Sequence, residues 1–244
     1  MICVRLDGPV VPVVPVYYFP LVTERNKARS PGEQVSELTA GRLSVYLRCL
    51  NTLDAAGVKS ISSKALAEQF QLNAAQIRKD LAYFGEFGVR GVGYYVKELR
   101  RHLRMLLGLD RTVRVAILGA GNLGFALADY PGFRQEGFAI VALFDTERAK
   151  IGRRSRGGVR IFDISEFRKL VQREHIDIAV VAVPADSAQT VVNTVVQAGV
   201  RAILNFSPGS LKVPPSVKLK NVDLTVSLES LSFFLAREEQ HART

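Results

Sequence analysis

The chain has 244 residues, 48% of them hydrophobic, which is enough for one large domain or two small ones with buried cores. Its 33 lysines and arginines outnumber its 23 aspartates and glutamates, so the net charge is +10, which favours polyanionic partners such as nucleic acid without requiring one. The two cysteines, Cys3 and Cys49, exclude a disulfide framework and a clustered zinc site, and no apolar run is long enough to span a membrane. We therefore expect a reducing, cytoplasmic location and no bound metal.

Residues 1–35 mix valine and proline and then turn polar, without a sustained helical or strand period. We expect them to form a disordered tail, or to precede a physiological start near Val35. They lack the basic cluster and the small-residue cleavage site of a signal peptide.

Residues 36–111 have the pattern of a first domain that begins with helices. The first helix is expected to begin at Ser36. Its core face is predicted to contain Leu43, Tyr46, Leu47, Leu50 and Leu53. A short second helix is expected over about residues 63–70, with Leu66 and Phe70 directed inward.

A third helix is expected to begin at Asn73, which forms a capping-box pattern with Gln76. Its apolar residues Ile77, Leu81 and Phe84 recur at helical spacing and predict its core face. The opposite face carries Gln76, Lys79, Asp80 and Tyr83, with Arg78 at its edge, and is rich in groups that can reach phosphates and base edges.

The glycine-rich residues 85–95 predict a short hairpin, and a further helix over about residues 96–107 ends the domain. Three helices followed by a hairpin make a winged helix, in which the third helix enters the major groove of DNA and the hairpin reaches the minor groove. The candidate DNA contacts are Gln76, Arg78, Lys79, Tyr83, Arg90 and Gly91. In the alternative interpretation, Arg78 and Lys79 are ordinary solvated residues of a small helical domain.

Residues 112–226 alternate apolar strands with helical segments, and repeated β-α-β units predict a Rossmann-type parallel sheet. The clearest strands cover residues 113–118, 139–144, 176–183 and 200–205. Residues 227–244 form a last helix, which is too apolar for a free tail, so we expect it to dock, for example on a second subunit. The expected fold class is therefore α/β, with a winged-helix domain ahead of the sheet.

The strongest motif is the turn between the first strand of this sheet and the next helix: Gly119, Ala120, Gly121, Asn122, Leu123 and Gly124. In a dinucleotide fingerprint, the first glycine permits the turn, the second admits a pyrophosphate and the third lets the helix pack closely. The helix N-terminus also offers N–H donors to the anion. The alternative is a glycine turn that binds another nucleotide-bearing ligand, such as coenzyme A, or no ligand.

Asp145 ends the next strand, where a carboxylate accepts hydrogen bonds from a ribose and repels a 2′-phosphate, so NAD(H) is favoured over NADP(H). Nearby Arg148 weakens this preference without reversing it. Two later turns also follow strand ends, and they supply candidate walls for the nicotinamide: Val183, Pro184, Asn205, Ser207 and Pro208. In the alternative interpretation these residues merely turn the chain.

Catalytic candidates are poor. None of His102, His175 and His241 lies near the expected ligand edge with an obvious acid partner, so we expect no enzyme. Since lysine, tyrosine or aspartate can also transfer protons, the alternative is an NAD-dependent oxidoreductase with an accessory basic domain.

The chain resembles the Rex family of redox-sensing repressors over about residues 43–236. The motifs that carry the resemblance are RLSVYLR at 42–48, QIRKDLAYFG at 76–85, RGVGY at 90–94, DYPGF at 129–133 and NFSP at 205–208. The residues before Ser36 and the segment Thr39-Ala40-Gly41 depart from the family pattern, but neither touches the glycine motif or the third helix.

The resemblance implies a homodimer that binds a palindromic operator in double-stranded DNA when NADH is scarce. NADH would release the operator, and NAD⁺ would compete for the same pocket. The resemblance also implies that the C-terminal helix is exchanged between subunits. By the same comparison, Arg48, Tyr130 and Asp223 would form an alternating contact that communicates ligand state between domains.

Overall fold

The computed structural model describes residues 35–242. The chain divides into two compact units, with the division between Asp110 and Arg111. The expected tail at residues 1–35 lies outside the described residues except for Val35. Within the described part of the chain, no helix is long and apolar enough to span a membrane, and no cluster of three or more metal-ligating side chains occurs.

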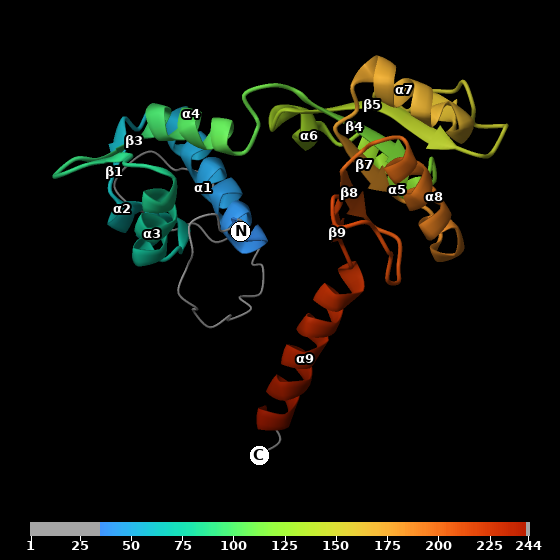
Figure 1. Cartoon of the computed structure of the whole chain (residues 1–244). Helices are drawn as coiled ribbons and strands as arrows, with labels where there is room; N and C mark the ends of the chain where they lie inside the picture. Colours follow the sequence, from blue (N-terminus) through green and yellow to red (C-terminus); the bar gives the residue numbers. More distant parts are fainter. Residues whose placement is uncertain (1–34, 243–244) are drawn as a thin grey trace. The chain divides into compact units, whose positions relative to one another are not determined.

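The first unit combines helices with a small sheet (Figure 1). Its helices are α1 (Glu37–Ala55), α2 (Ser63–Phe70), α3 (Ala74–Phe84) and α4 (Val96–Leu106), and its strands are β1 (Ser60–Ile61), β2 (Gly88–Val89) and β3 (Gly93–Tyr95). The predicted order of three helices and an antiparallel hairpin is confirmed, because β2 pairs with β3. Strand β1, which pairs with the other edge of β3, was not predicted because two residues give no readable alternation.

Buried apolar side chains of α1, α2, α3 and α4 form the core of the first unit. All five residues predicted for the core face of α1 are buried, and so are Ile77 and Leu81 on α3. Phe70 and Phe84, which the pattern places inside, are only partly buried. Side-chain caps begin α1 and α3, since Ser36 accepts the N–H of Thr39 and Asn73 accepts the N–H of Gln76.

The second unit is built on a parallel six-stranded sheet in the order β6-β5-β4-β7-β8-β9 (Figure 1). The strands are β4 (Val113–Leu118), β5 (Phe138–Asp145), β6 (Ile161–Asp163), β7 (Ile178–Val181), β8 (Ala202–Asn205) and β9 (Lys218–Asn221). The helices before the last are α5 (Asn122–Ala128), α6 (Pro131–Gln135), α7 (Phe167–Glu174) and α8 (Ala185–Gln197), with a 3₁₀ turn, η1, at Ile164–Glu166. The four clearest predicted strands are confirmed as β4, β5, β7 and β8. Strands β6 and β9 were missed because one is short and the other carries two lysines.

The strand order of this sheet creates a potential ligand-binding position at the carboxyl ends of its central strands. From β4 the chain winds outward through β5 and β6, and then returns to place β7 on the other side of β4. The carboxyl ends of β4 and β7 are therefore a topological switch point, where open α/β sheets bind ligands. The central strands are buried on both faces, which explains their continuous apolar sequence.

The last helix, α9 (Leu224–Ala242), begins three residues before the predicted start at residue 227. Its large apolar side chains are 57–66% exposed. They are Leu224, Val226, Leu228, Leu231, Phe233, Phe234 and Leu235. The apolar surface that the sequence predicted for this helix is thus uncovered in the single chain.

Candidate functional site

The glycine turn after β4 has the backbone geometry that its motif predicts. Gly119 has φ +109°, and a Cβ there would lie 2.3 Å from the carbonyl oxygen of Ala182. A Cβ on Gly124 would meet the carbonyl oxygen of Gly119, so α5 packs closely on the turn. A Cβ on Gly121, in contrast, would meet no atom within 4 Å. The turn therefore leaves open space where the fingerprint admits a pyrophosphate.

The first turn of α5 supplies donors to that space. Gly121 is the N-cap residue and offers no side chain to the first amides of the helix. Asn122 and Leu123 follow as exposed residues, whereas Ala120 is fully buried. Uncapped amides beside open space fit the phosphate of a nucleotide.

Asp145, at the end of β5, accepts three backbone hydrogen bonds. Its Oδ2 accepts the N–H of Ala120 at 2.9 Å, and its Oδ1 accepts those of Thr146 at 2.8 Å and Glu147 at 2.9 Å. Burial raises the pKa of this carboxyl, but the amides of Glu147 and Ala120 and the ammonium of Lys150, with Nζ 3.3 Å from Oδ2, outweigh it and hold the pKa below its usual value. The carboxylate is thus ionised and ties the glycine turn to β5.

Lys150 was not identified from the sequence. Its ammonium lies between Asp145 and Glu147, and the hydrogen bond to Glu147 is the largest cause of its raised pKa. A cation five residues after the strand end is the signal that could have found it. Among the described residues, Arg148, which was expected to weaken the preference for NAD(H), forms no ion pair, and Lys150 is the cation beside Asp145.

The two later turns are joined at the same edge of the sheet. The Ser207 hydroxyl donates to the carbonyl of Val183 at 2.6 Å, and the Ser207 N–H donates to Oδ1 of Asn205 at 2.9 Å. Asn205 is fully buried, and its Nδ2 donates to the Ser207 carbonyl and to Oδ1 of Asn221 on β9. Asn205 and Ser207 therefore hold the turns in place, while Pro184 occupies the N-cap position of α8 and Pro208 is exposed.

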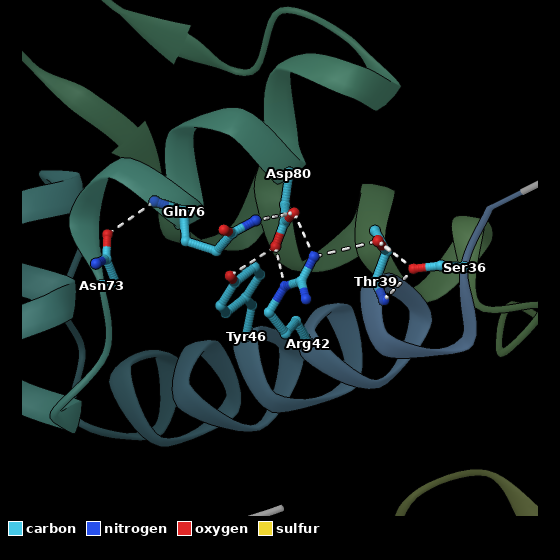
Figure 2. Close-up of polar contacts among 7 residues, drawn as sticks. All are labelled: Ser36, Thr39, Arg42, Tyr46, Asn73, Gln76 and Asp80. Atoms are coloured by element: carbon cyan, nitrogen blue, oxygen red, sulfur yellow. Dashed lines mark hydrogen bonds and ion pairs between the residues drawn. The ribbon is translucent and has the colours of Figure 1, made fainter. Parts of the chain in front are cut away.

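The face of α3 that the sequence pattern predicts to be exposed carries one buried acid, which meets side chains of α1 (Figure 2). Asp80, which the pattern placed among the exposed residues, is 4% exposed. Arg42 donates from Nε to Oδ2 at 2.5 Å and from Nη2 to Oδ1 at 2.8 Å, and the Tyr46 hydroxyl donates to Oδ2 at 2.9 Å. The prediction that Asp80 faces solvent is therefore wrong, because two side chains of α1 cover the carboxylate and compensate its charge.

Gln76 also belongs to this cluster. Its Nε2 donates to Oδ1 of Asp80 at 2.7 Å. The N-cap half of the predicted capping box is confirmed, but the returning half is replaced, because the Gln76 side chain bonds Asp80 instead of the Asn73 amide. The spacing of four residues between Gln76 and Asp80 could have indicated this pair.

The pKa values of Asp80, Arg42 and Tyr46 are shifted in the directions that stabilise this cluster. Burial raises the pKa of Asp80, but hydrogen bonds from Arg42, Tyr46 and Gln76 outweigh it and hold that pKa below its ordinary value. The bond to Asp80 raises the pKa of Arg42, and burial raises the pKa of Tyr46. At neutral pH the cluster therefore holds an ionised carboxylate, a guanidinium and a neutral phenol.

The remaining candidates for DNA contact are accessible. Arg78 and Lys79 are exposed on α3, and Nη1 of Arg78 donates to Oγ of Ser63 at 3.0 Å. Tyr83 is 46% exposed on the same helix. Arg90 and Gly91 form the turn of the β2–β3 hairpin and are both exposed. These side chains thus lie on the two parts of a winged helix that contact DNA.

The three residues expected to communicate between units are also exposed. Arg48 lies on α1 of the first unit. Tyr130 is the N-cap residue of α6 in the second unit, with its ring 5.1 Å from that of Phe133. Asp223 precedes α9 and accepts the N–H of Thr225 at 2.8 Å. Their alternating contact stays a prediction.

Comparison with known families agrees with the two units. Residues 34–82 match the family model described as "Putative DNA-binding protein N-terminus", and residues 110–209 match the model described as "CoA binding domain". A curated redox-sensing transcriptional repressor Rex of Carboxydothermus hydrogenoformans is 46% identical over 207 residues, which cover 85% of this chain and 99% of that protein. The chain belongs to the Rex family of redox-sensing transcriptional repressors.

Solved structures of the Rex-family repressor RSP have the same fold. RSP in complex with NAD⁺ and operator DNA matches with a TM-score of 0.80 and 41% identity, covering 86% of this chain and 97% of that one. RSP in complex with NADH matches with a TM-score of 0.75 and 40% identity, covering 86% and 98%. Both matches extend over most of the chain, so they relate both units to one Rex protein.

The Rex family is one of transcriptional repressors and not of enzymes. The oxidoreductase alternative is therefore not favoured. His102 on α4 packs against Phe87, with 5.2 Å between ring centroids, and His175 is the C-cap residue of α7. The side chain of His241 lies outside the described residues.

Proposed function

We propose that this chain represses transcription by binding operator DNA as a homodimer, and that NADH bound in the second unit releases the DNA. NAD⁺ competes for the same pocket, so transcription follows the ratio of NADH to NAD⁺. The observation that carries the proposal is the similarity to RSP over 86% of the chain. RSP is a Rex-family repressor, and one of its structures is a complex with NAD⁺ and operator DNA while another is a complex with NADH.

The dinucleotide site is proposed at the switch point of the sheet. Gly119, Gly121 and Gly124 form the turn for the pyrophosphate, with Ala120, Asn122 and Leu123 beside it, and Asp145 accepts hydrogen bonds from the adenosine ribose. Val183, Pro184, Asn205, Ser207 and Pro208 form or support the nicotinamide end. The ionised state of Asp145 supports NAD(H) over NADP(H), because a 2′-phosphate would face a carboxylate.

The DNA contacts are proposed on α3 and on the hairpin turn. Gln76, Arg78, Lys79 and Tyr83 face the major groove, and Arg90 and Gly91 reach the minor groove. A palindromic operator requires two such readers at a fixed separation, which a homodimer provides. The exposed apolar side chains of α9 support its docking on a second subunit, where the helix is exchanged between protomers.

The two units are proposed to communicate through Arg48, Tyr130 and Asp223, with Arg48 alternating between partners as the ligand state changes. NADH can shift the dimer only by its differential affinity for the two states, and a hundredfold preference corresponds to about 2.7 kcal/mol. Operator DNA then weakens NADH binding by the same factor. A cytoplasmic location follows for a regulator of transcription with this cofactor.

The test is a binding matrix with the purified full chain. Fluorescence anisotropy of labelled promoter DNA is followed during titration with NADH, NAD⁺, NADPH or coenzyme A. We expect NADH to release the DNA at the lowest concentration and NAD⁺ to oppose it. Release by coenzyme A alone would instead support a repressor that senses a different nucleotide. Coenzyme A is included because residues 110–209 match the family described as "CoA binding domain". DNA retention at saturating NADH would contradict the proposal.

A further inference from the structure

Asp80 is placed where a DNA-binding helix ordinarily excludes a carboxylate. It lies on α3, four residues after Gln76, on a helix whose exposed face carries Arg78 and Lys79. A free carboxylate there would repel the phosphates of DNA. Instead, Asp80 is 4% exposed and accepts hydrogen bonds from three side chains, which compensate its charge inside the protein.

We infer that Asp80 is a positioning residue for base recognition, which orients the amide of Gln76 so that Gln76 recognises an adenine in the major groove. Arg42 and Tyr46 are the residues that hold Asp80 in place. The inference rests on the proposed DNA-binding function and adds to it a base preference and the residues that produce it.

The orientation of the Gln76 amide follows from the chemistry of its partner. An ionised carboxylate can only accept hydrogen bonds, so the amide must present its Nε2 to Asp80, and the 2.7 Å bond leaves Oε1 directed away from it. One N–H of Nε2 is used by Asp80. The other N–H and Oε1 remain for a ligand, and they form a donor and an acceptor side by side.

That pair of groups matches one base edge in the major groove. Adenine presents N7 as an acceptor and N6–H₂ as a donor, and glutamine pairs with both. Guanine presents two acceptors, N7 and O6, so Oε1 would face O6 without a proton between them. An amide free to rotate could exchange its donor and acceptor, whereas the bond to Asp80 opposes that exchange.

The position of Gln76 in the helix agrees with such a role. It is the third residue of α3, and the N-terminal residues of a recognition helix are those that contact base edges. It is also only partly buried. Lys79, one turn later and exposed, is suited to a phosphate contact that carries no sequence information.

The support for Asp80 extends along α1 (Figure 2). Arg42 binds both carboxylate oxygens, and its Nη2 also donates to Oγ1 of Thr39 at 3.1 Å. Thr39 in turn bonds the N-cap Ser36, with 2.9 Å between the two hydroxyl oxygens. Tyr46 is itself buried, so its hydroxyl has little freedom to leave Asp80. These contacts fix the carboxylate from the side of α1.

The experiment compares base preference and not affinity alone. Full-length wild type, Gln76→Ala and Tyr46→Phe are used to select duplexes from a pool with randomised half-sites, and thermal unfolding is recorded for each. We expect the wild type to require adenine at one position of each half-site and Gln76→Ala to lose that requirement alone. Placing 7-deazaadenine, which lacks N7, at that position should weaken the wild type about tenfold and leave Gln76→Ala unaffected.

Tyr46→Phe tests the positioning step, because it keeps the ring and removes one donor to Asp80. The Tyr46→Phe variant should show an adenine preference about threefold weaker than that of the wild type, with unchanged base preferences at the other positions of the half-site. Lys79→Ala is the matched control on the same helix. It should weaken binding to all sequences and reduce the salt slope by about one, with the adenine preference intact.

The outcomes separate the two proposals. If the wild type binds DNA and releases it with NADH, but Gln76→Ala keeps every base preference, the inference about Gln76 is overturned and the proposed function stands. If Tyr46→Phe lowers all preferences equally, or none, the positioning role of Asp80 is overturned. If the wild type binds no duplex in the pool, the proposed function fails and the inference fails with it.

Discussion

The Ser207 hydroxyl donates a hydrogen bond to the carbonyl of Val183, 24 residues earlier in the chain, at 2.6 Å. This bond links the loops that follow β7 and β8 at the edge where the dinucleotide is proposed to bind. Ser207 is buried, so if its hydroxyl were removed, water could not reach the Val183 carbonyl without a rearrangement of the loops. The geometry of the proposed nicotinamide end therefore depends on the Ser207 side chain.

Ser207→Ala is expected to destabilise the second unit by about 1–2 kcal/mol, because the Val183 carbonyl loses its buried donor. NADH affinity should fall, while DNA binding without NADH should persist. Thermal unfolding and the fluorescence of bound NADH provide the measurements. Pro208→Ala, at an exposed neighbour, is the control and should change stability by less than about 0.5 kcal/mol.

Gly121→Ala and Gly124→Ala are expected to separate ligand binding from folding. A Cβ at Gly121 meets nothing within 4 Å, so the variant should unfold like the wild type but bind DNA without responding to NADH. A Cβ at Gly124 would overlap the Gly119 carbonyl, so that variant should lose stability in the second unit. A Gly121→Ala protein that still releases DNA at the wild-type NADH concentration would contradict the pyrophosphate site.

The ion pair between partly exposed Arg42 on α1 and buried Asp80 on α3 should make the first unit sensitive to acid. The pKa of Asp80 is lower in the folded chain than its ordinary value of 3.8, so its pairing stabilises the fold above that value and the stability is lost as pH falls below it. Asp80→Asn should lose about 3 kcal/mol at neutral pH, since Arg42 is left without its acid. Its stability should also change less between about pH 5 and pH 2 than that of the wild type, which urea unfolding at several pH values would measure. An equally steep decline in both proteins would show that other carboxyls dominate.

Cys49 should be chemically inert in the folded protein. It is buried on α1, and burial raises the pKa of its thiol to about 12. The thiolate that reacts with iodoacetamide is therefore scarce at neutral pH. In a Cys3→Ser variant, used to restrict labelling to Cys49, we expect modification only after denaturation. Rapid labelling of the native chain would mean that α1 opens readily.

The long, strongly patterned elements could be predicted from the sequence. The core face of α1 and strand β4 follow from apolar periodicity and from the run of buried residues that a parallel sheet requires. The glycine turn could also be predicted, since close approach of backbone at Gly119 and Gly124 leaves room for no side chain.

Contacts between distant segments could not be predicted in the same way. Asp80 belongs to the polar face of α3 by periodicity, and its burial depends on Arg42, which is 38 residues away. Asn221 on β9 joins the proposed dinucleotide site through a tertiary contact of the same kind, with Asn205 on β8. Periodicity describes one element at a time, so the side chain that compensates a buried charge appears only when two elements are placed together.

The pairing of Arg42 with Asp80 also constrains how relatives of this chain can diverge. A change of Arg42 alone leaves the buried Asp80 uncompensated, and a change of Asp80 alone leaves the partly buried Arg42 without its acid, whereas replacement of both by apolar residues of similar volume can be nearly neutral. The two positions should therefore change together during evolution. The Gln76 position should vary in step with them, so substitutions of Arg42 on α1, which lies outside the proposed DNA contacts, should accompany a change in the preferred half-site base.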